Sequence, residues 1–264
     1  MSVFSLKLLA LITMFIDHIG EFFPKIPHVV ILRQIGRISA PLFLLGTGYG
    51  IRYTSSPKKY LTRLYILSAA MGIGNGILIH FFQDSEVFLS NNFPSTIFLI
   101  SCLGFLSEIY ESNPDEFKKY SLIFLISQII SLAVFYIFIN ELTPASAEAL
   151  SGILPNIFHC EGGFFFVALG FVIFKFCTDK KALFSTYIFC CLIYLAAQIH
   201  YMISENIPFY FLFTRDVGWM MIFASAFMLL CNGKKGYCGK YTKYIFYFFY
   251  PLHIWGLFLL SNIK

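Results

Sequence analysis

The chain has 264 residues, of which 58% are hydrophobic and only 12% are charged, and its formal net charge is +5. A water-soluble domain carries about a quarter charged residues, so this composition excludes a soluble fold and leaves no stretch for a separate soluble domain. The charges gather in short clusters between apolar runs that are long enough to cross hydrocarbon. We therefore expect one integral membrane domain over residues 1–264, built as an all-α bundle of transmembrane helices.

Hydropathy over windows of about 19 residues predicts about nine membrane-spanning helices. The first apolar run continues to Phe23, contains Asp17 and His18, and is followed by no small-residue cleavage site. This run is therefore expected to be a span rather than a cleaved signal peptide. The spans are predicted near residues 3–23, 35–53, 60–82, 93–110, 119–140, 156–175, 182–203, 216–232 and 243–262.

The connections between these spans alternate in charge, which indicates a fixed topology. The connection over 52–63 holds four basic residues and no acid, whereas Asp84 and Glu86 lie in a connection without a base. Because Lys and Arg concentrate on the cytoplasmic side, we expect the N-terminus in the cytoplasm and, with an odd number of spans, Lys264 outside. The expected location is the cell (cytoplasmic) membrane.

The cysteine pattern predicts neither a disulfide framework nor a zinc site. The seven cysteines are odd in number, sit mostly inside apolar runs and form no CxxC pair, so we expect small core residues. They are Cys102, Cys160, Cys177, Cys190, Cys191, Cys231 and Cys238.

Ionisable residues inside the first two spans are the first candidates for function, since a charge in hydrocarbon costs at least about 2.5 kcal/mol. Asp17 and His18 are adjacent in the outer half of the first span, and neighbours on a helix point about 100° apart. Each therefore needs a partner from another helix. Arg33 or Arg37 is a natural counter-ion for Asp17, because a short loop returns the second helix beside the first. The alternative is an ion pair that only locks the two helices together.

Lys7 shares a helix face with His18. It lies eleven residues earlier, which is about 20° from the same face and about 16.5 Å away along the axis. A cation at the inner end and an imidazole nearer the outer end suit a site that holds an anionic donor from the cytoplasm and delivers a group outward. A Lys at the inner end of a first span is also what the bias toward cytoplasmic basic residues predicts.

The histidines gather near the outer side under this topology. The group fits either a catalytic base with supporting polar residues or a transition-metal site, because imidazole is a favoured ligand. No HxxxH or HxxH pair occurs, so we expect no metal. The residues are His18, His28, His80, His159 and His200, with His253 inside the last helix, and Glu161 follows His159 at the expected start of the sixth helix.

Two N-terminal stretches, Leu6–Gly20 and Leu32–Phe43, resemble the signature of the TraX family. Members of that family are associated with N-terminal acetylation of conjugative pilin. The resemblance spans almost the whole chain and is thinnest between about 110 and 155. Further matches follow in chain order at Asn92, Thr96, Gly104, Glu161–Gly163 and Phe249–His253.

TraX proteins are in turn similar to the wider acyltransferase-3-like group, which moves acyl groups from coenzyme A onto acceptors outside the membrane. In that group a basic residue, ten intervening positions and a histidine mark the first helix, and Lys7 and His18 have this spacing. The resemblance implies that His18 is the catalytic base. In the mechanism we expect, Asp17 is a second catalytic residue that orients or electrostatically supports the site, and both direct transfer and an intermediate acylated on His18 stay open. It departs from the family pattern at His159-Cys160-Glu161, where a carboxylate, an aromatic residue and a glycine would be more familiar.

The resemblance also implies roles for residues outside the first helix pair. Lys7, Arg33 and Arg37 are expected to bind the phosphates of the donor or to orient the site, and Asn92, Glu161 and His253 are expected to line the substrate cavity.

The expected activity is transfer of an acyl group from acetyl-CoA, or another acyl-CoA, to an amine or hydroxyl of a pilin-like protein or envelope glycan outside the membrane. The expected partners are membrane lipid, the donor and this protein or glycan acceptor, with no nucleic acid. The alternative is a non-enzymatic transporter or a fimbrial or conjugation assembly factor, in which buried ion pairs line a pathway. The odd number of spans and the lack of a detectable inverted repeat argue against a secondary transporter.

Overall fold

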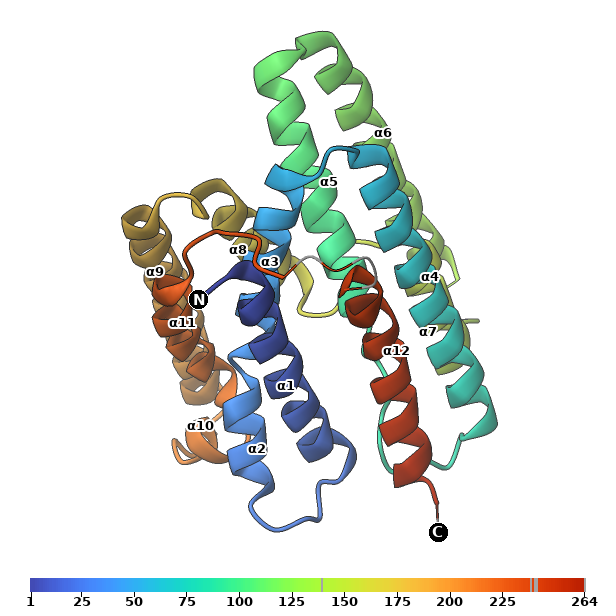
Figure 1. Cartoon of the computed structure of the whole chain (residues 1–264). Coiled ribbons are helices and arrows are strands. Elements are labelled where there is room, and N and C mark those ends of the chain that lie inside the picture. The colour runs from blue at the N-terminus through green and yellow to red at the C-terminus, as the bar shows by residue number, and fades with distance from the viewer. Residues whose placement is uncertain (139, 238, 240–241, 264) are drawn as a thin grey trace. The chain divides into compact units, whose positions relative to one another are not determined.

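The computed structural model describes residues 1–138, 140–237, 239 and 242–263, and within these ranges the chain is helical with no strand (Figure 1). Seven described helical stretches are long and apolar enough to cross a membrane when the two successive helices over Val29–Tyr53 are counted as one, and two shorter apolar stretches cover Gly163–Phe176 and Val217–Leu230. The predictions of an all-α bundle and of about nine apolar helices are confirmed. These helices indicate a multi-pass membrane protein. Cys238, Lys240 and Lys264 lie outside the described residues, and the cytoplasmic position of the N-terminus stays a prediction.

The described chain divides into two compact units, residues 1–49 with 175–263 and residues 50–174. A single membrane domain stays a prediction. The helices of the first unit are α1 (Val3–Phe22), α2 (Val29–Gly36), α3 (Ser39–Tyr53, whose last residues belong to the second unit), α9 (Lys180–Ser204), α10 (Phe211–Thr214), the 3-10 helix η1 (Val217–Phe223), α11 (Ala224–Leu230) and α12 (Thr242–Ser261). Those of the second unit are α4 (Pro57–Phe81), α5 (Phe93–Ser112), α6 (Pro114–Ile137), α7 (Pro144–Ile153) and α8 (Gly163–Phe176, whose last two residues belong to the first unit).

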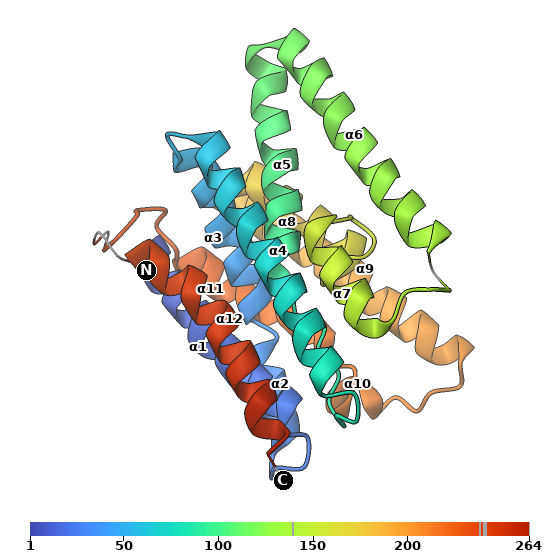
Figure 2. The same cartoon turned by 90° about the vertical axis from the view of Figure 1, so that its right-hand side faces the viewer.

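Helix α1 is the central helix of the first unit and packs against α2 and α12 (Figures 1 and 2). It begins after Ser2, whose side chain accepts a hydrogen bond from the backbone N–H of Ser5 at 3.2 Å and so satisfies one free donor of the first turn. Leu6, Ala10 and Met14, at intervals of four residues, form its buried face. The apolar periodicity of the first span therefore becomes the core of this unit.

The second predicted span is broken into two helices. The prediction of one helix over 35–53 is wrong in its start, since α2 already begins at Val29. At Arg37 the backbone N–H bonds to Gln34 O, three residues back, so the turn tightens and α3 starts anew at Ser39. Arg33 lies in the last turn of α2 and Arg37 is its C-terminal cap, and both side chains reach α1.

In the second unit, α7 lies along α4 at a glycine contact. A Cβ built on Gly72 would come within 2.7 Å of Cα of Gly152, and the reverse contact is equally close. The sequence reading missed α7 because its ten residues are too short for a hydropathy window of about 19 residues. The signal for it is Thr143-Pro144, since the Thr143 side chain accepts a hydrogen bond from Ser146 N at 3.2 Å and Pro suits the first helical position.

The sixth predicted span, 156–175, begins later than expected, at Gly163. Gly162 and Gly163 have φ angles of 76° and 55°, a conformation that ends helical continuity on their N-terminal side. Residues 156–162 form a turn closed by Cys160 N donating to Asn156 O at 2.9 Å. His159 and Glu161 therefore lie in a turn before the helix and not in its first turn. The remaining spans agree with the predicted ranges within a few residues.

Candidate functional site

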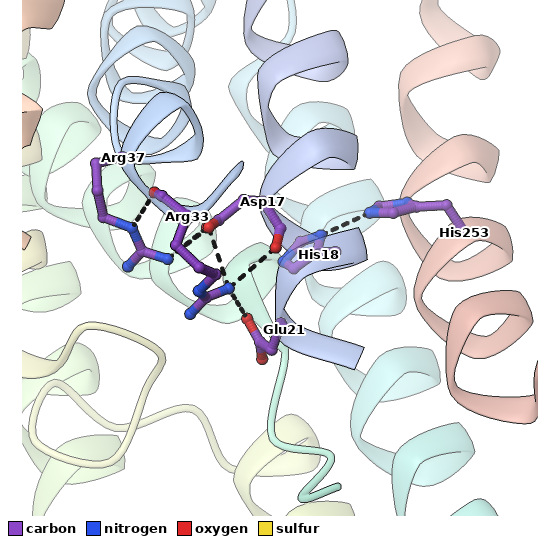
Figure 3. Close-up of polar contacts among 6 residues, drawn as sticks. All are labelled: Asp17, His18, Glu21, Arg33, Arg37 and His253. Carbon is purple, nitrogen blue, oxygen red and sulfur yellow. Dashed lines mark hydrogen bonds and ion pairs between the residues drawn. The ribbon is translucent and has the colours of Figure 1, made fainter. Parts of the chain in front are cut away.

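The strongest gathering of polar side chains in the first unit lies where α1 meets α2 and α12 (Figure 3). Toward α2, the carboxylates of Asp17 and Glu21 meet the guanidinium groups of Arg33 and Arg37, a group we name the ion cluster. Toward α12, the His18 ring meets the His253 ring, and we name these two residues the histidine pair. Adjacent residues of one helix thus bind to different neighbouring helices, as their 100° separation requires.

The ion cluster balances its charges inside the helix bundle. Arg37 Nη2 donates to both carboxylate oxygens of Asp17, at 2.7 and 2.6 Å. Arg33 Nη1 lies 3.0 Å from Asp17 Oδ1 and 2.6 Å from Glu21 Oε2. The predicted pairing of Asp17 with an arginine of the second span is confirmed, and both arginines take part. Two acids against two bases give a neutral group, which is the arrangement in which buried charges are tolerated.

Local sequence spacing builds this cluster. Asp17 and Glu21 are four residues apart on α1, and Arg33 and Arg37 are four residues apart at α2, so each pair faces one direction. Gly36 lets the two helices approach, because a Cβ at that position would overlap the Asp17 side chain. Sequence reasoning missed Glu21, although its position one turn after Asp17 is the signal that could have identified it.

Gly36 gives a direct test of this close approach. We expect Gly36→Ala to destabilise the folded protein by about 1–3 kcal/mol, because the added methyl group must displace the Asp17 side chain or move α2. Gly256→Ala on α12 is the matched control, since a Cβ there meets nothing within 4 Å. Thermal unfolding of both variants in detergent measures the difference, and equal unfolding temperatures would contradict the packing described for Gly36.

The histidine pair fixes the positions of its protons. His253 Nδ1 lies 2.7 Å from Phe249 O, and because a carbonyl oxygen can only accept, this nitrogen carries a hydrogen. In a neutral His253 ring, Nε2 is then an acceptor, and it lies 2.9 Å from His18 Nδ1. His18 Nδ1 therefore donates, and the lone pair of a neutral His18 is on Nε2. The pair presents His18 Nε2 as a base.

Aromatic rings hold the histidine pair in place. The His253 ring stacks on the Phe249 ring with centroids 4.7 Å apart. Phe15 of α1 meets the Phe249 ring edge-on at 6.0 Å and the His253 ring edge-on at 6.1 Å. His18 and His253 are only 5% and 7% exposed, so neither ring faces lipid. Burial and stacking restrict the orientation of both imidazoles.

Lys7 lies on the same continuous helix as His18, so the predicted spacing of eleven residues is retained in the structure. Its side chain runs along α3, where a Cβ at Gly46 would come within 2.7 Å of Lys7 Cε. Contact of Lys7 with a donor phosphate stays a prediction, as do such contacts for Arg33 and Arg37.

The structure places Asn92 and Glu161 in the second unit, whereas Asp17, His18 and His253 belong to the first. Asn92 is 3% exposed and its Nδ2 donates to Ser68 O at 3.1 Å. Thr96 Oγ1 donates to the backbone oxygen of Glu161 at 2.6 Å, which ties the turn before α8 to α5. The predicted substrate contacts of Asn92, Glu161 and His253 stay predictions. No group of three His, Cys, Asp or Glu side chains suited to a metal occurs among the described residues.

Comparison with known proteins relates this chain to one family. The family model described as TraX protein matches residues 2–261. The chain is also similar to the uncharacterized protein RP591 of Rickettsia prowazekii (strain Madrid E), with 38% identity over 85 residues. That match covers 32% of this chain and 32% of the Rickettsia protein, so it spans about a third of each. No solved structure matches the chain.

Proposed function

Since this chain belongs to the TraX family, which is linked to pilin acetylation, we propose that it is an integral-membrane acyltransferase. Its donor is acetyl-CoA or another acyl-CoA, and its acceptor is an amine or hydroxyl of a pilin-like protein or envelope glycan outside the membrane. The single observation that carries the proposal is the histidine pair, a buried contact that assigns the proton of a neutral His18 ring to Nδ1 and so makes Nε2 its acceptor nitrogen. We place the protein in the cell membrane with its N-terminus in the cytoplasm, where the donor is available.

In the proposed reaction His18 acts as a general base. The acceptor nitrogen or oxygen attacks the thioester carbonyl carbon while His18 Nε2 takes the proton of the attacking group. The new bond from nitrogen or oxygen to the acyl carbon forms, the carbon–sulfur bond breaks, and the proton passes from the imidazolium to the sulfur of the leaving coenzyme A. The products are the acylated acceptor and free coenzyme A, and His18 returns to its neutral state.

The neighbours of His18 act by positioning it. His253 accepts the hydrogen bond from His18 Nδ1 and so sets which nitrogen is the base, which makes it a positioning residue in this proposal. Asp17, through the ion cluster, holds α2 on the helix that carries the base. Lys7 is assigned to the donor phosphates. Arg33 and Arg37 already bind carboxylates of the ion cluster, so each would contact a phosphate only while it also binds its carboxylate. Asn92 and Glu161 are assigned to the acceptor.

A transfer assay tests the proposed function. The purified full chain in lipid vesicles is incubated with radiolabelled acetyl-CoA and an envelope fraction from a strain that lacks the protein. We expect label on an envelope protein or glycan, at a level well above that with heat-inactivated protein. Hydroxylamine then separates the two acceptor chemistries, because it cleaves acetyl esters of hydroxyls and leaves acetyl amides intact. Absence of label with folded protein would overturn the proposal.

Binding of coenzyme A separates this enzyme from a non-enzymatic assembly factor. A ligand that binds only the folded state stabilises it by about 2.7 kcal/mol at a hundred times its Kd, and this raises the unfolding temperature. We expect coenzyme A to stabilise the purified protein and adenosine alone to have a weaker effect. A protein that acts only in assembly would show no stabilisation by coenzyme A.

A further inference from the structure

The second unit contains a cavity of about 810 Å³ between α4, α5 and α6. Its volume lies within the range of ligand-binding pockets, about 300–1,000 Å³. Figure 2 shows α5 and α6 running apart from the turn that joins them, and α4 lies beside α5. The walls are apolar, with Leu61 and Tyr65 from α4, Phe98 and Leu106 from α5, and Ile123 and Phe124 from α6.

The two ends of this cavity differ in chemistry. At one end, Lys58 at the start of α4 and Glu116 at the start of α6 line it together with Ser55 and Ser56. At the other end lies Gln128, whose Nε2 donates to Pro155 O at 3.2 Å and whose Oε1 accepts from Ile157 N at 3.0 Å. The amide of Gln128 is thus bonded within the protein and closes the apolar end, whereas the charged end lies where helices α4 and α6 begin.

The length of the cavity matches one leaflet of a bilayer. From position 116 to position 128 along α6 the helix rises about 18 Å. Half of a hydrocarbon core of about 30 Å is about 15 Å, so a chain anchored at the charged end would reach the middle of the membrane. The large side chains on the outside of α6 are mostly exposed, as expected for a helix in contact with lipid. The acyl chain of a membrane lipid is therefore the molecule most available to enter this cavity.

We propose that this cavity, which we name the α4–α6 groove, binds one phospholipid with an ethanolamine headgroup. One acyl chain lies between α5 and α6, the phosphate lies at the Lys58 ammonium, and the lipid amine lies at the Glu116 carboxylate. The assignment of the headgroup follows from charge complementarity, because the mouth presents one cation and one anion, as the headgroup does. Phosphatidylglycerol has no amine for Glu116, and the quaternary nitrogen of phosphatidylcholine has no hydrogen to donate. This proposal is independent of the acyltransferase activity.

Native mass spectrometry of the purified full chain tests the headgroup assignment. Phosphatidylethanolamine, phosphatidylglycerol and phosphatidylcholine with the same acyl chains are added at equal concentration, and we expect the ethanolamine lipid to dominate the one-to-one adduct. Lys58→Gln should weaken retention of every phospholipid by about fivefold. Glu116→Gln should remove the preference for ethanolamine over choline. Lys59→Gln and Asp115→Asn are matched controls that change neighbouring charges outside the groove lining and should leave the adduct unchanged.

The acyl-chain position is tested by filling the groove. Ile123 and Ile130 lie on α6 with 54% and 50% exposure, but only Ile123 lines the groove. We expect Ile123→Trp to lose the lipid adduct and Ile130→Trp to keep it. Equal retention by these two variants, or equal retention of choline and ethanolamine lipids by the unchanged protein, would overturn the proposal. Displacement of the lipid by a long-chain acyl-CoA would also overturn it, because the groove would then belong to the donor.

Discussion

Replacing His18 by alanine is expected to lower the rate of acetyl transfer by about 10²–10⁴-fold, which is the usual contribution of a general base. The proposed reaction needs a lone pair at His18 Nε2, and alanine removes it without adding a charge to the buried site. The rate of label transfer, normalised to folded protein from size-exclusion chromatography, measures the effect. His200→Ala, at an exposed position on α9, is the matched control and should retain normal transfer. Equal rates for the two variants would rule out His18 as the base.

His253 provides a second readout of the same machinery. A glutamine at this position can still accept a hydrogen bond from His18 Nδ1 through its side-chain oxygen, whereas phenylalanine keeps the ring shape and cannot. We expect His253→Gln to retain substantially more transfer than His253→Phe. The reverse order would show that His253 does not act through the proton on His18 Nδ1.

Replacing Asp17 by asparagine is expected to cost about 3–5 kcal/mol of folding free energy, because it leaves a partly buried guanidinium without its charge partner. Reversible unfolding of the purified protein in mixed detergent measures the loss. The control is Asp115→Asn, which removes an ion pair with Lys118 of 3.8 Å whose side chains are 96% and 78% exposed. Such a surface pair contributes little, so this control should unfold like the unchanged protein.

A second substitution separates charge balance from other effects of the Asp17 change. Arg37→Gln combined with Asp17→Asn removes one charge of each sign and leaves Arg33 with Glu21 at 2.6 Å. We expect the double variant to be more stable than Asp17→Asn alone, because the stability losses caused by substitutions within one ion network do not simply add. Simple addition of the two single losses would mean that the ion cluster does not act as a unit.

The sequence predicts most helices of this protein well, because a hydropathy window of about 19 residues has the length of a helix that crosses the hydrocarbon core. It also predicts the pairing of Asp17 with an arginine, since a short loop determines which residues of α1 and α2 can meet. Helix α7 could not be found in this way, because its ten residues pack on α4 through glycines rather than through an apolar run. The start of α8 depends on two glycines with positive φ, a backbone property that hydropathy does not report.

The contact between His18 and His253 is the part of the site that the sequence could not predict. These residues are 235 positions apart, and no helix periodicity relates them. The sequence marks each as an ionisable residue within an apolar helix, which makes both candidates for function. The tautomer of His18 follows only from the position of Phe249 O one helical turn before His253.

The same separation has a consequence for biosynthesis. Helix α1 leaves the ribosome early, but the residue that orients its imidazole is on α12, which is the last described helix to be made. An unfinished chain that already lies in the membrane therefore carries His18 without its hydrogen-bond acceptor. Under the proposed mechanism, chains that stall or are cut before α12 lack the residue that orients His18, and we expect them to transfer acyl groups far more slowly than the full chain.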